Sequence, residues 1–200
     1  MMAQVKRCFA VLLILVCLFG MVGCGKADDS LLLSEAERLL RLSLVYNDLL
    51  FEKGIPINPT GAISGIYQEA DKETLIKEYG FSNLADIKNG AKQVYTQAAV
   101  ADLFRLSVES LSDGTSLLRS AYCYDNKDGV LYVNREGLNY KTDEVSFDYT
   151  TLKVKEKKRD VATLSILAQK DGDDKSKVIE VTMKYEGGVW LLDSLTCIRF

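Results

Sequence analysis

Four acidic residues in the C-terminal half are the side chains best placed to do acid–base chemistry. They are Asp143, Glu144, Asp148 and Asp193. Two carboxyl groups that flank a scissile bond about 5 to 9 Å apart are the machinery of glycoside hydrolysis. Asp148, however, alternates with apolar neighbours along a predicted strand, so we expect it to point outward into solvent. The pattern therefore favours solvated carboxylates over a catalytic pair.

The chain contains no histidine among its 200 residues. This absence excludes a Ser-His-Asp or Cys-His nucleophile pair and a histidine general base. It also excludes the histidine-containing ligand sets of catalytic zinc. No GxGxxG or GxxxxGK[ST] phosphate loop follows a strand, so no nucleotide site or other cofactor is indicated. We expect a protein that is not an enzyme.

Two charged segments could bind ions. The carboxylates at 171–174 lack the alternating spacing and the distant glutamate of an EF-hand loop, so a hairpin turn explains them better and no metal site is expected. The basic cluster from Lys153 to Arg159 could contact anionic wall polymers. Lysines that protect the edge of a sheet are the commoner explanation of such a run.

Aromatic side chains gather in the same half of the chain. The candidate lining of a ligand pocket is Phe147, Tyr149, Tyr185 and Trp190. Rings with polar tips suit a concave binding site. The alternative, which is the commoner fate of aromatic residues in strands, is that they fill the core beneath the helices.

Two of the five cysteines, Cys123 and Cys197, lie in predicted strands of the C-terminal half. In an exported protein they could form a disulfide. Cysteines in strands are also often small buried apolar residues without a covalent partner. Two thiols without histidine do not make a zinc site of the usual composition.

The N-terminus indicates export. Phe9 to Gly23 is an apolar run of fifteen residues behind Lys6 and Arg7, shorter than the roughly 20 residues that span a bilayer and typical of a signal peptide. The tetrapeptide Met21-Val22-Gly23-Cys24 resembles the bacterial lipobox, although Met21 replaces the commoner leucine. The resemblance implies that Cys24 is lipidated on sulfur and becomes the new N-terminus. An uncleaved anchor and an ordinary signal peptide are the alternatives.

The mature protein is long enough for one domain. Residues 1–23 form the expected signal peptide, residues 24–33 the lipidated cysteine with a short tether, and residues 34–200 a single domain. Loss of Lys6 and Arg7 leaves 23 basic against 28 acidic residues, a net charge of −5. A net negative chain without a row of basic residues along one face lacks the positive surface that nucleic-acid binding requires.

Residues 30–112 have helical periodicity. Ser34-Glu35-Ala36-Glu37 fits a capping box, which predicts a helix that begins there and stops at Gly54. Asp71 opens a second helical block, which Gly80 ends, and Asn83 and Thr96 are candidate N-caps of later helices. Prolines and glycines predict a loop over 55–66.

From about residue 115 onward, apolar residues recur at every second position, which is the spacing of β-strands. The expected strands are 118–124, 130–133, 145–154, 161–169, 178–185 and 189–195, the first two joined by an Asp-Gly turn. In the third strand the apolar residues fall on odd-numbered positions before Thr150 and on even-numbered positions after Thr151. A β-bulge of one extra residue would place both sets on the same face of the sheet. The expected fold class is α+β, with N-terminal helices packed on a strongly curved antiparallel sheet of about six strands.

The last strand pair, VTMKYEGGVWLLDSL at 181–195, looks like the final hairpin of the NTF2-like (cystatin-like) α+β roll. Such an ending is frequent among small secreted lipoproteins of that superfamily. FSNLADIK at 81–88 with VYTQAA at 94–99 is similar to a helix-turn-helix segment of the bacterial DL-endopeptidase-inhibitor family. The resemblance implies a roll with a cone-shaped pocket and a peptidoglycan hydrolase as partner.

These features predict a non-enzymatic binding or regulatory lipoprotein, anchored by lipid groups such as palmitate and diacylglycerol on the extracytoplasmic face of a bacterial membrane. As an inhibitor it could use the loop Ile55–Ile66 or the hairpin Asp171–Lys175. The alternatives are a small-molecule carrier or carboxylate-based enzyme that uses the cone pocket, and a structural role in an envelope complex. A cavity with two or more inward carboxylates would favour catalysis, whereas a filled interior would favour a scaffold.

Overall fold

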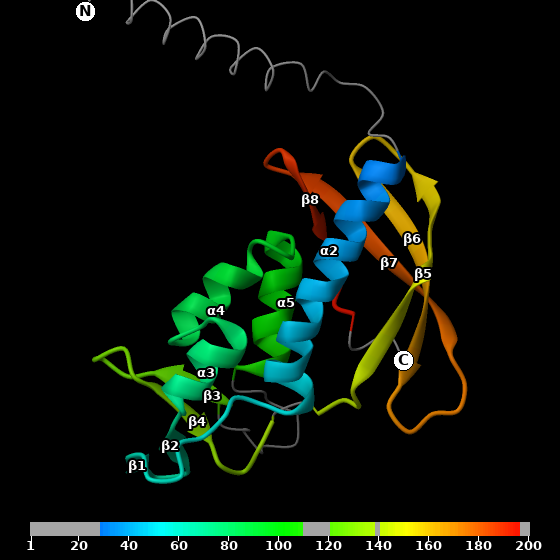
Figure 1. The fold of residues 1–200 in the computed structure, drawn as a ribbon. Helices are drawn as coiled ribbons and strands as arrows, with labels where there is room; N and C mark the ends of the chain where they lie inside the picture. The colour runs from blue at the N-terminus through cyan, green and yellow to red at the C-terminus, as the bar shows by residue number, and fades with distance from the viewer. Residues whose placement is uncertain (1–28, 110–120, 139–140, 197–200) are drawn as a thin grey trace, which may run out of the picture.

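The computed structural model describes residues 29–109, 121–138 and 141–196, which form an α+β protein with two four-stranded antiparallel sheets (Figure 1). The strand orders are β1-β2-β4-β3 and β5-β6-β7-β8. The expectation of one sheet of about six strands was therefore wrong. Of the two strands nearest the middle of the chain, β4 pairs with β2 of the N-terminal half and β3 pairs with β4, so both belong to a different sheet from β5.

The helical elements are α2 (Asp29–Asn47), the π-helix η1 (Asp48–Glu52), α3 (Lys72–Tyr79), α4 (Leu84–Ala91) and α5 (Gln97–Ser107). The first helix begins at Asp29, so Ser34 lies inside it and is not its N-cap. Leu32 is 1% exposed and extends the buried stripe of α2 upstream, which explains the earlier start. Only residues 25–28 then separate the candidate lipidation site, Cys24, from the helix, and Cys24 itself lies outside the described residues.

The predicted starts of the three shorter helices are confirmed. Asp71, Asn83 and Thr96 precede α3, α4 and α5, and each side chain accepts a hydrogen bond from the backbone N–H three residues later. Gly80 ends α3 in the left-handed region, with φ 77°. Local hydrogen-bonding chemistry fixes these boundaries, which is why the sequence predicts them well.

The first sheet comprises β1 (Ile63–Ser64), β2 (Tyr67–Glu69), β3 (Cys123–Asp125) and β4 (Leu131–Asn134). The predicted turn between β3 and β4 contains Gly129 at φ 75°. The short strands β1 and β2 lie at the end of the segment predicted as a loop and just beyond it. They form because β2 pairs with β4, a partner far away in the sequence.

The second sheet is a meander of β5 (Val145–Lys157), β6 (Val161–Lys170), β7 (Lys177–Glu186) and β8 (Val189–Leu192). Its bulge lies where the parity change predicted it. Asp148 pairs with Leu167, and Lys153 pairs with Ser165, so five steps along β5 match two along β6. The irregularity therefore contains three extra residues and not one.

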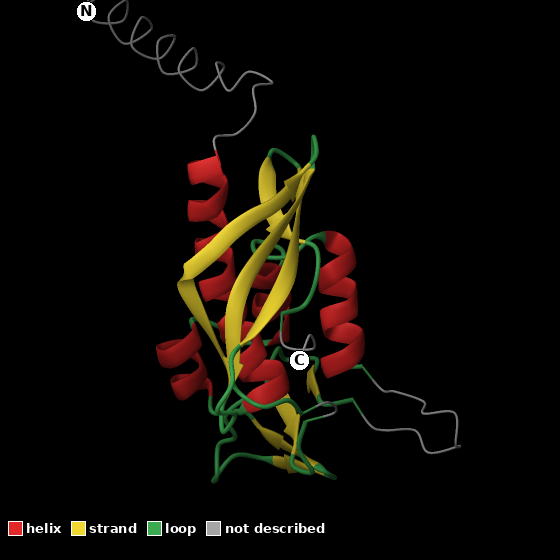
Figure 2. Cartoon of the chain, turned by 90° about the vertical axis from the view of Figure 1, so that its right-hand side faces the viewer, coloured by secondary structure: helices red, strands yellow, loops and turns green. Residues whose placement is uncertain are grey.

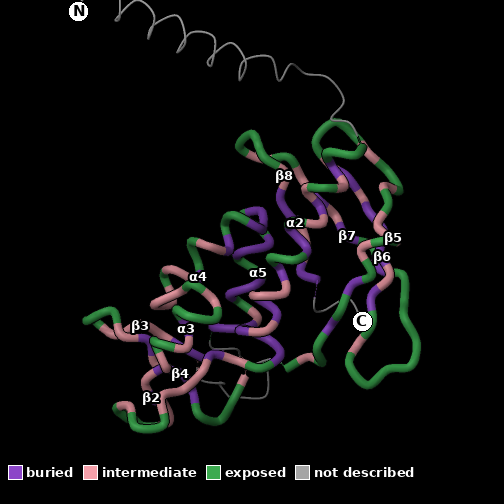
Figure 3. Tube along the Cα trace, viewed as in Figure 1, coloured by how far each residue is buried: buried purple, intermediate pink, exposed green. Residues whose placement is uncertain are grey.

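Helix α2 packs against the second sheet and contacts both β5 and β8 (Figures 1 and 2). The inward side chains of the two central strands are at most 5% exposed (Figure 3). They are Ala162, Leu164, Ile166 and Ala168 on β6 and Ile179, Val181 and Met183 on β7. They belong to one core cluster with the buried leucines of α2. The face of the sheet that α2 covers is therefore filled by apolar side chains.

Backbone hydrogen bonds join the helices to the end of the sheet. The Thr96 N–H, just before α5, donates to the Leu192 carbonyl at 2.9 Å, and the Leu192 N–H donates to the Val94 carbonyl at 2.9 Å. None of the helices in the described ranges is long and apolar enough to cross a bilayer.

Candidate functional site

The four aromatic residues proposed to line a pocket form two separate ring pairs. The ring centroids of Phe147 and Tyr149 are 6.2 Å apart, and those of Tyr185 and Trp190 are 5.5 Å apart. Across the sheet, Phe147 lies level with Lys177 of β7. Tyr185 is eight residues further along that strand, a distance of about 26 Å. The four side chains therefore do not line a single pocket.

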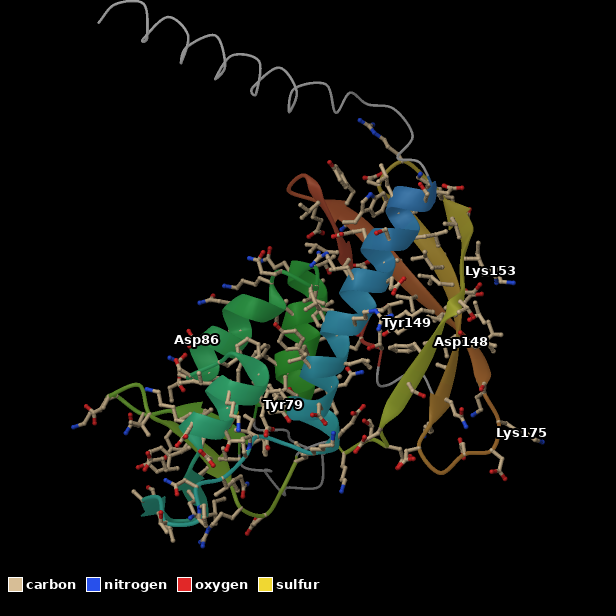
Figure 4. The ribbon with its side chains drawn as sticks, viewed as in Figure 1. Tyr79, Asp86, Asp148, Tyr149, Lys153 and Lys175 are labelled. Carbon is tan, nitrogen blue, oxygen red and sulfur yellow. The ribbon has the colours of Figure 1, made fainter. Side chains whose placement is uncertain are left out.

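Tyr149 belongs to the packing between helix and sheet. Its ring lies on the side of β5 that faces α2 (Figure 4), and the guanidinium carbon of Arg41 is 3.9 Å from the ring centroid, within range of a cation–π interaction. Burial raises the pKa of the Tyr149 hydroxyl, although the charge of Arg41 opposes this effect. The hydroxyl oxygen is buried without a hydrogen-bond partner. Helix α2 thus closes the interior at this point.

Asp148 lies at the start of the bulge in β5. It is exposed, as its alternation with apolar residues predicted. Its carboxylate accepts hydrogen bonds from the Thr150 N–H at 3.0 Å and from the Thr150 hydroxyl at 2.6 Å. The Thr151 hydroxyl donates to the Asp148 carbonyl at 2.7 Å and accepts from the Leu167 N–H at 2.9 Å. These contacts give Asp148 a structural role.

Two further acidic candidates also have structural partners. Asp143 lies 3.2 Å from the ammonium of Lys170, at the end of β6. Asp193 accepts a hydrogen bond at 2.7 Å from the hydroxyl of Thr96, the N-cap of α5. The structure does not bring these carboxylates together with Asp148 around a common space.

A group of titratable side chains surrounds η1, and of these the sequence indicated only Glu144. Asp48 accepts a hydrogen bond from the Tyr79 hydroxyl at 2.8 Å and lies 3.0 Å from the Lys53 ammonium. The same ammonium is 3.7 Å from Glu144. Glu52 is 8% exposed, and its Oε1 is buried without a hydrogen-bond partner. We call these five residues the η1 cluster.

Glu52 is the most perturbed carboxyl of the η1 cluster. Burial raises its pKa to about 7, and the negative charges of Asp48 and Glu144 add to the effect. Lys53 and the backbone N–H of Val145 oppose it. A carboxyl that titrates near neutral pH has the property of a general acid or base. However, Oε1 is shielded from solvent, so a substrate has no access to it.

The geometry of η1 explains why spacing did not reveal this cluster. The N–H groups of Lys53 and Gly54 both donate to the Asp48 carbonyl at 2.9 Å, so the chain makes wider turns than an α-helix. A π-helix rotates the side chains that follow it relative to α-helical spacing, and such segments are frequent at functional sites. The available signal was two acids, Asp48 and Glu52, enclosing three apolar residues.

A surface depression of about 350 Å³ lies between residues 144–146 and residues 169–172, at the start of β5 and the end of β6. None of the four candidate aromatics lines it. Among the residues that the structure describes, no group of three His, Cys, Asp or Glu side chains could hold a metal ion.

No protein-family model matches this chain, and no curated protein is similar to it in sequence.

The basic cluster lies on β5, an edge strand, and on the turn that follows. Lys155, Lys157 and Lys158 each form an ion pair with an acidic side chain. Lys153 points away from α2 (Figure 4). This arrangement favours protection of the edge over a site for an anionic polymer.

Cys123, on β3, has a buried free thiol with 1% exposure. Burial raises its pKa, with a further contribution from Asp125. The other member of the expected disulfide, Cys197, lies outside the described residues.

Proposed function

We propose that the protein is a bacterial lipoprotein whose NTF2-like α+β domain is a non-enzymatic binding or regulatory module on the extracytoplasmic face of the membrane. The lipobox-like sequence that ends at Cys24 supports the anchor. The observation that carries the rest is the filled inner face of the second sheet, where the inward residues of β6 and β7 are at most 5% exposed. A domain without an interior for a substrate acts through its surface.

The partner we propose is a cell-wall peptidoglycan hydrolase, which the family resemblance implies. An inhibitor of such an enzyme needs an exposed loop on a rigid base. Segment 55–66 has this form, because the Ile55 N–H donates to the buried Tyr122 hydroxyl at 2.8 Å, while Ile63 is 59% exposed. The hairpin at 171–176 is exposed throughout. Both segments lie at the end of the molecule away from the start of α2 (Figure 1).

The test is to mix the purified protein with wall hydrolases of the producing cells and to measure complex formation and muropeptide release from peptidoglycan. We expect slower release at protein concentrations that form the complex. Ile63→Asp should weaken both effects, whereas Ile76→Asp, at a residue 48% exposed on α3, should change neither. Failure to form a complex with any wall hydrolase would remove the inhibitor proposal.

The η1 cluster supports a second candidate function, carboxylate-based catalysis on a wall polysaccharide or another small substrate. Its support is the pKa of about 7 at Glu52, next to Asp48 and Glu144. The shielded Oε1 argues against it. A reproducible hydrolysis that Glu52→Gln abolishes, in a protein that still folds, would establish catalysis in place of binding.

A further inference from the structure

One end of the molecule brings together the start of α2 and two turns of the second sheet. The β5–β6 turn at 158–160 and the β7–β8 turn at 187–188 both reach the end at which α2 begins, in two perpendicular views (Figures 1 and 2). An ion pair of 3.3 Å joins Lys157, the last residue of β5, to Asp29, the first residue of α2. We call this end of the molecule the α2 end.

Exposed apolar side chains mark the α2 end. Tyr185 and Val189 flank the β7–β8 turn and are 42% and 53% exposed, and Leu31 in the first turn of α2 is 67% exposed. Trp190 pairs across the strands with Tyr185, and their ring centroids are 5.5 Å apart. Tyrosine and tryptophan are the side chains enriched where hydrocarbon meets water at a membrane surface.

The length of chain before α2 limits how far the α2 end can lie from an anchor at Cys24. Five residue steps separate Cys24 from Asp29, which span at most about 18 Å when fully extended. Acyl chains on Cys24 would therefore keep the start of α2 next to the bilayer. The two hairpin turns beside it would then face the lipid headgroups.

Charge contributes little to this surface. Lys157, Lys158 and Arg159 lie at the β5–β6 turn, but the first two are paired with Asp29 and Glu156. Ion pairs at an exposed site leave little net attraction for anionic lipid. The apolar and aromatic side chains are therefore the main source of contact with a membrane surface.

We propose that the α2 end is a membrane-docking surface, on which Leu31, Tyr185, Val189 and Trp190 rest in the headgroup region of the bilayer that holds the lipid anchor. This inference rests on the proposed function, because the acyl anchor supplies the attachment and the surface only orients the domain. In this orientation segment 55–66, which is exposed at 59, 60 and 62–65, and the exposed hairpin 171–176 (Figure 1) point away from the membrane, toward the cell wall.

The test uses the fluorescence of Trp190, the only tryptophan in the chain. The full-length lipidated protein is extracted from producing membranes and reconstituted in vesicles of phosphatidylglycerol and phosphatidylethanolamine. Lipids brominated near the headgroup end of their acyl chains should quench the emission, and the bilayer should protect Trp190 from aqueous iodide. Equal emission in brominated and plain vesicles, with full access to iodide, would overturn the docking surface.

Two variants separate docking from simple attachment. Val189→Ser combined with Tyr185→Ser should reduce quenching by brominated lipid while the protein still floats with the vesicles. Val178→Ser changes a valine that is 67% exposed on the same strand as Tyr185, next to the opposite hairpin, and should leave quenching unchanged. Quenching equally unaffected in both variants would contradict the proposal. A protein that lacks acyl mass and does not float would instead refute the anchor.

Discussion

At the scale of single residues, the carboxyl of Glu52 is the acid most changed by the fold. Its pKa rises from an ordinary value of 4.5 to about 7, chiefly through burial. Between these pH values the folded protein keeps a proton that the unfolded chain has lost. Unfolding therefore releases a proton in this window, and the free energy of unfolding falls as pH rises through it.

We predict that deprotonation of Glu52 lowers the free energy of unfolding by at most about 3 kcal/mol as the pH rises from 4.5 to 7. Glu52→Gln cannot ionise and should remove this part of the pH dependence. Urea denaturation at a series of pH values measures it. Glu136→Gln, which changes an exposed acid in a loop, should keep the full dependence. An unchanged slope in Glu52→Gln would contradict the buried position of this carboxyl.

Cys123 provides a second test at this scale. Because burial raises the pKa of its thiol, we expect the folded protein at neutral pH to react slowly with iodoacetamide. The same protein in urea should react rapidly, which mass spectrometry of the peptide containing Cys123 can follow without reductant. A thiol that stays unmodified in urea until a reductant is added would indicate a disulfide, with Cys197 as the partner.

At the scale of elements, the sequence predicted features that depend on neighbouring residues. The caps at Asp71, Asn83 and Thr96 each involve a hydrogen bond over three residues, so their signals are local. The strands β1 and β2 have only two and three residues, too few to show a period. They exist because β2 pairs with the distant strand β4, and β1 pairs with β2. Strands of this kind cannot be predicted from the pattern of neighbouring residues.

The bulge of β5 combines both kinds of information. Parity located it near Thr150 and Thr151, because apolar residues must return to the buried face. Parity could not give its size, since one and three extra residues restore the same alternation. The hydrogen bonds of Thr151 to the Asp148 carbonyl and from the Leu167 N–H stabilise the longer form.

We predict that Thr151→Val lowers the free energy of unfolding by about 1 to 2 kcal/mol, because it leaves the partly buried Leu167 N–H without its acceptor. Urea denaturation measures this loss, and faster amide exchange at Leu167 would place it at the bulge. Thr163→Val, a substitution of the same shape on β6, should have a much smaller effect. Equal losses in the two variants would mean that the Thr151 hydroxyl does not support the bulge.

At the scale of the whole molecule, the alternation of residues along a strand predicts on which face of the sheet a side chain lies, but not which element covers that face. Tyr149 was a candidate for a pocket, yet Arg41 of α2 covers its ring at 3.9 Å. The η1 cluster likewise needed the fold, because it combines η1, the last residue of α3 and the residue before β5. The sequence therefore predicted the α+β class and most elements, but neither the division into two sheets nor the position of the titratable group.

The direction in which α2 begins connects the fold with the proposed anchor. Asp29 lies at the end of the molecule opposite segments 55–66 and 171–176 (Figure 1). An anchor five residues upstream would hold one end at the membrane and leave the other free. This polarity suits a protein that meets its partner in the cell wall.

The anchor can be tested in living cells by replacing the cysteine that carries it. Cys24→Ala removes the sulfur that accepts the lipid, so the protein should appear either soluble or with its signal peptide still attached. Cys17→Ala changes a cysteine inside the apolar run and should leave maturation unchanged. Fractionation with detergent extraction gives the location, and the mass of the mature N-terminus shows acyl chains or their absence. Because a lipid is the only membrane attachment proposed once residues 1–23 are removed, normal cleavage with full membrane retention in Cys24→Ala would rule out this mode of anchoring.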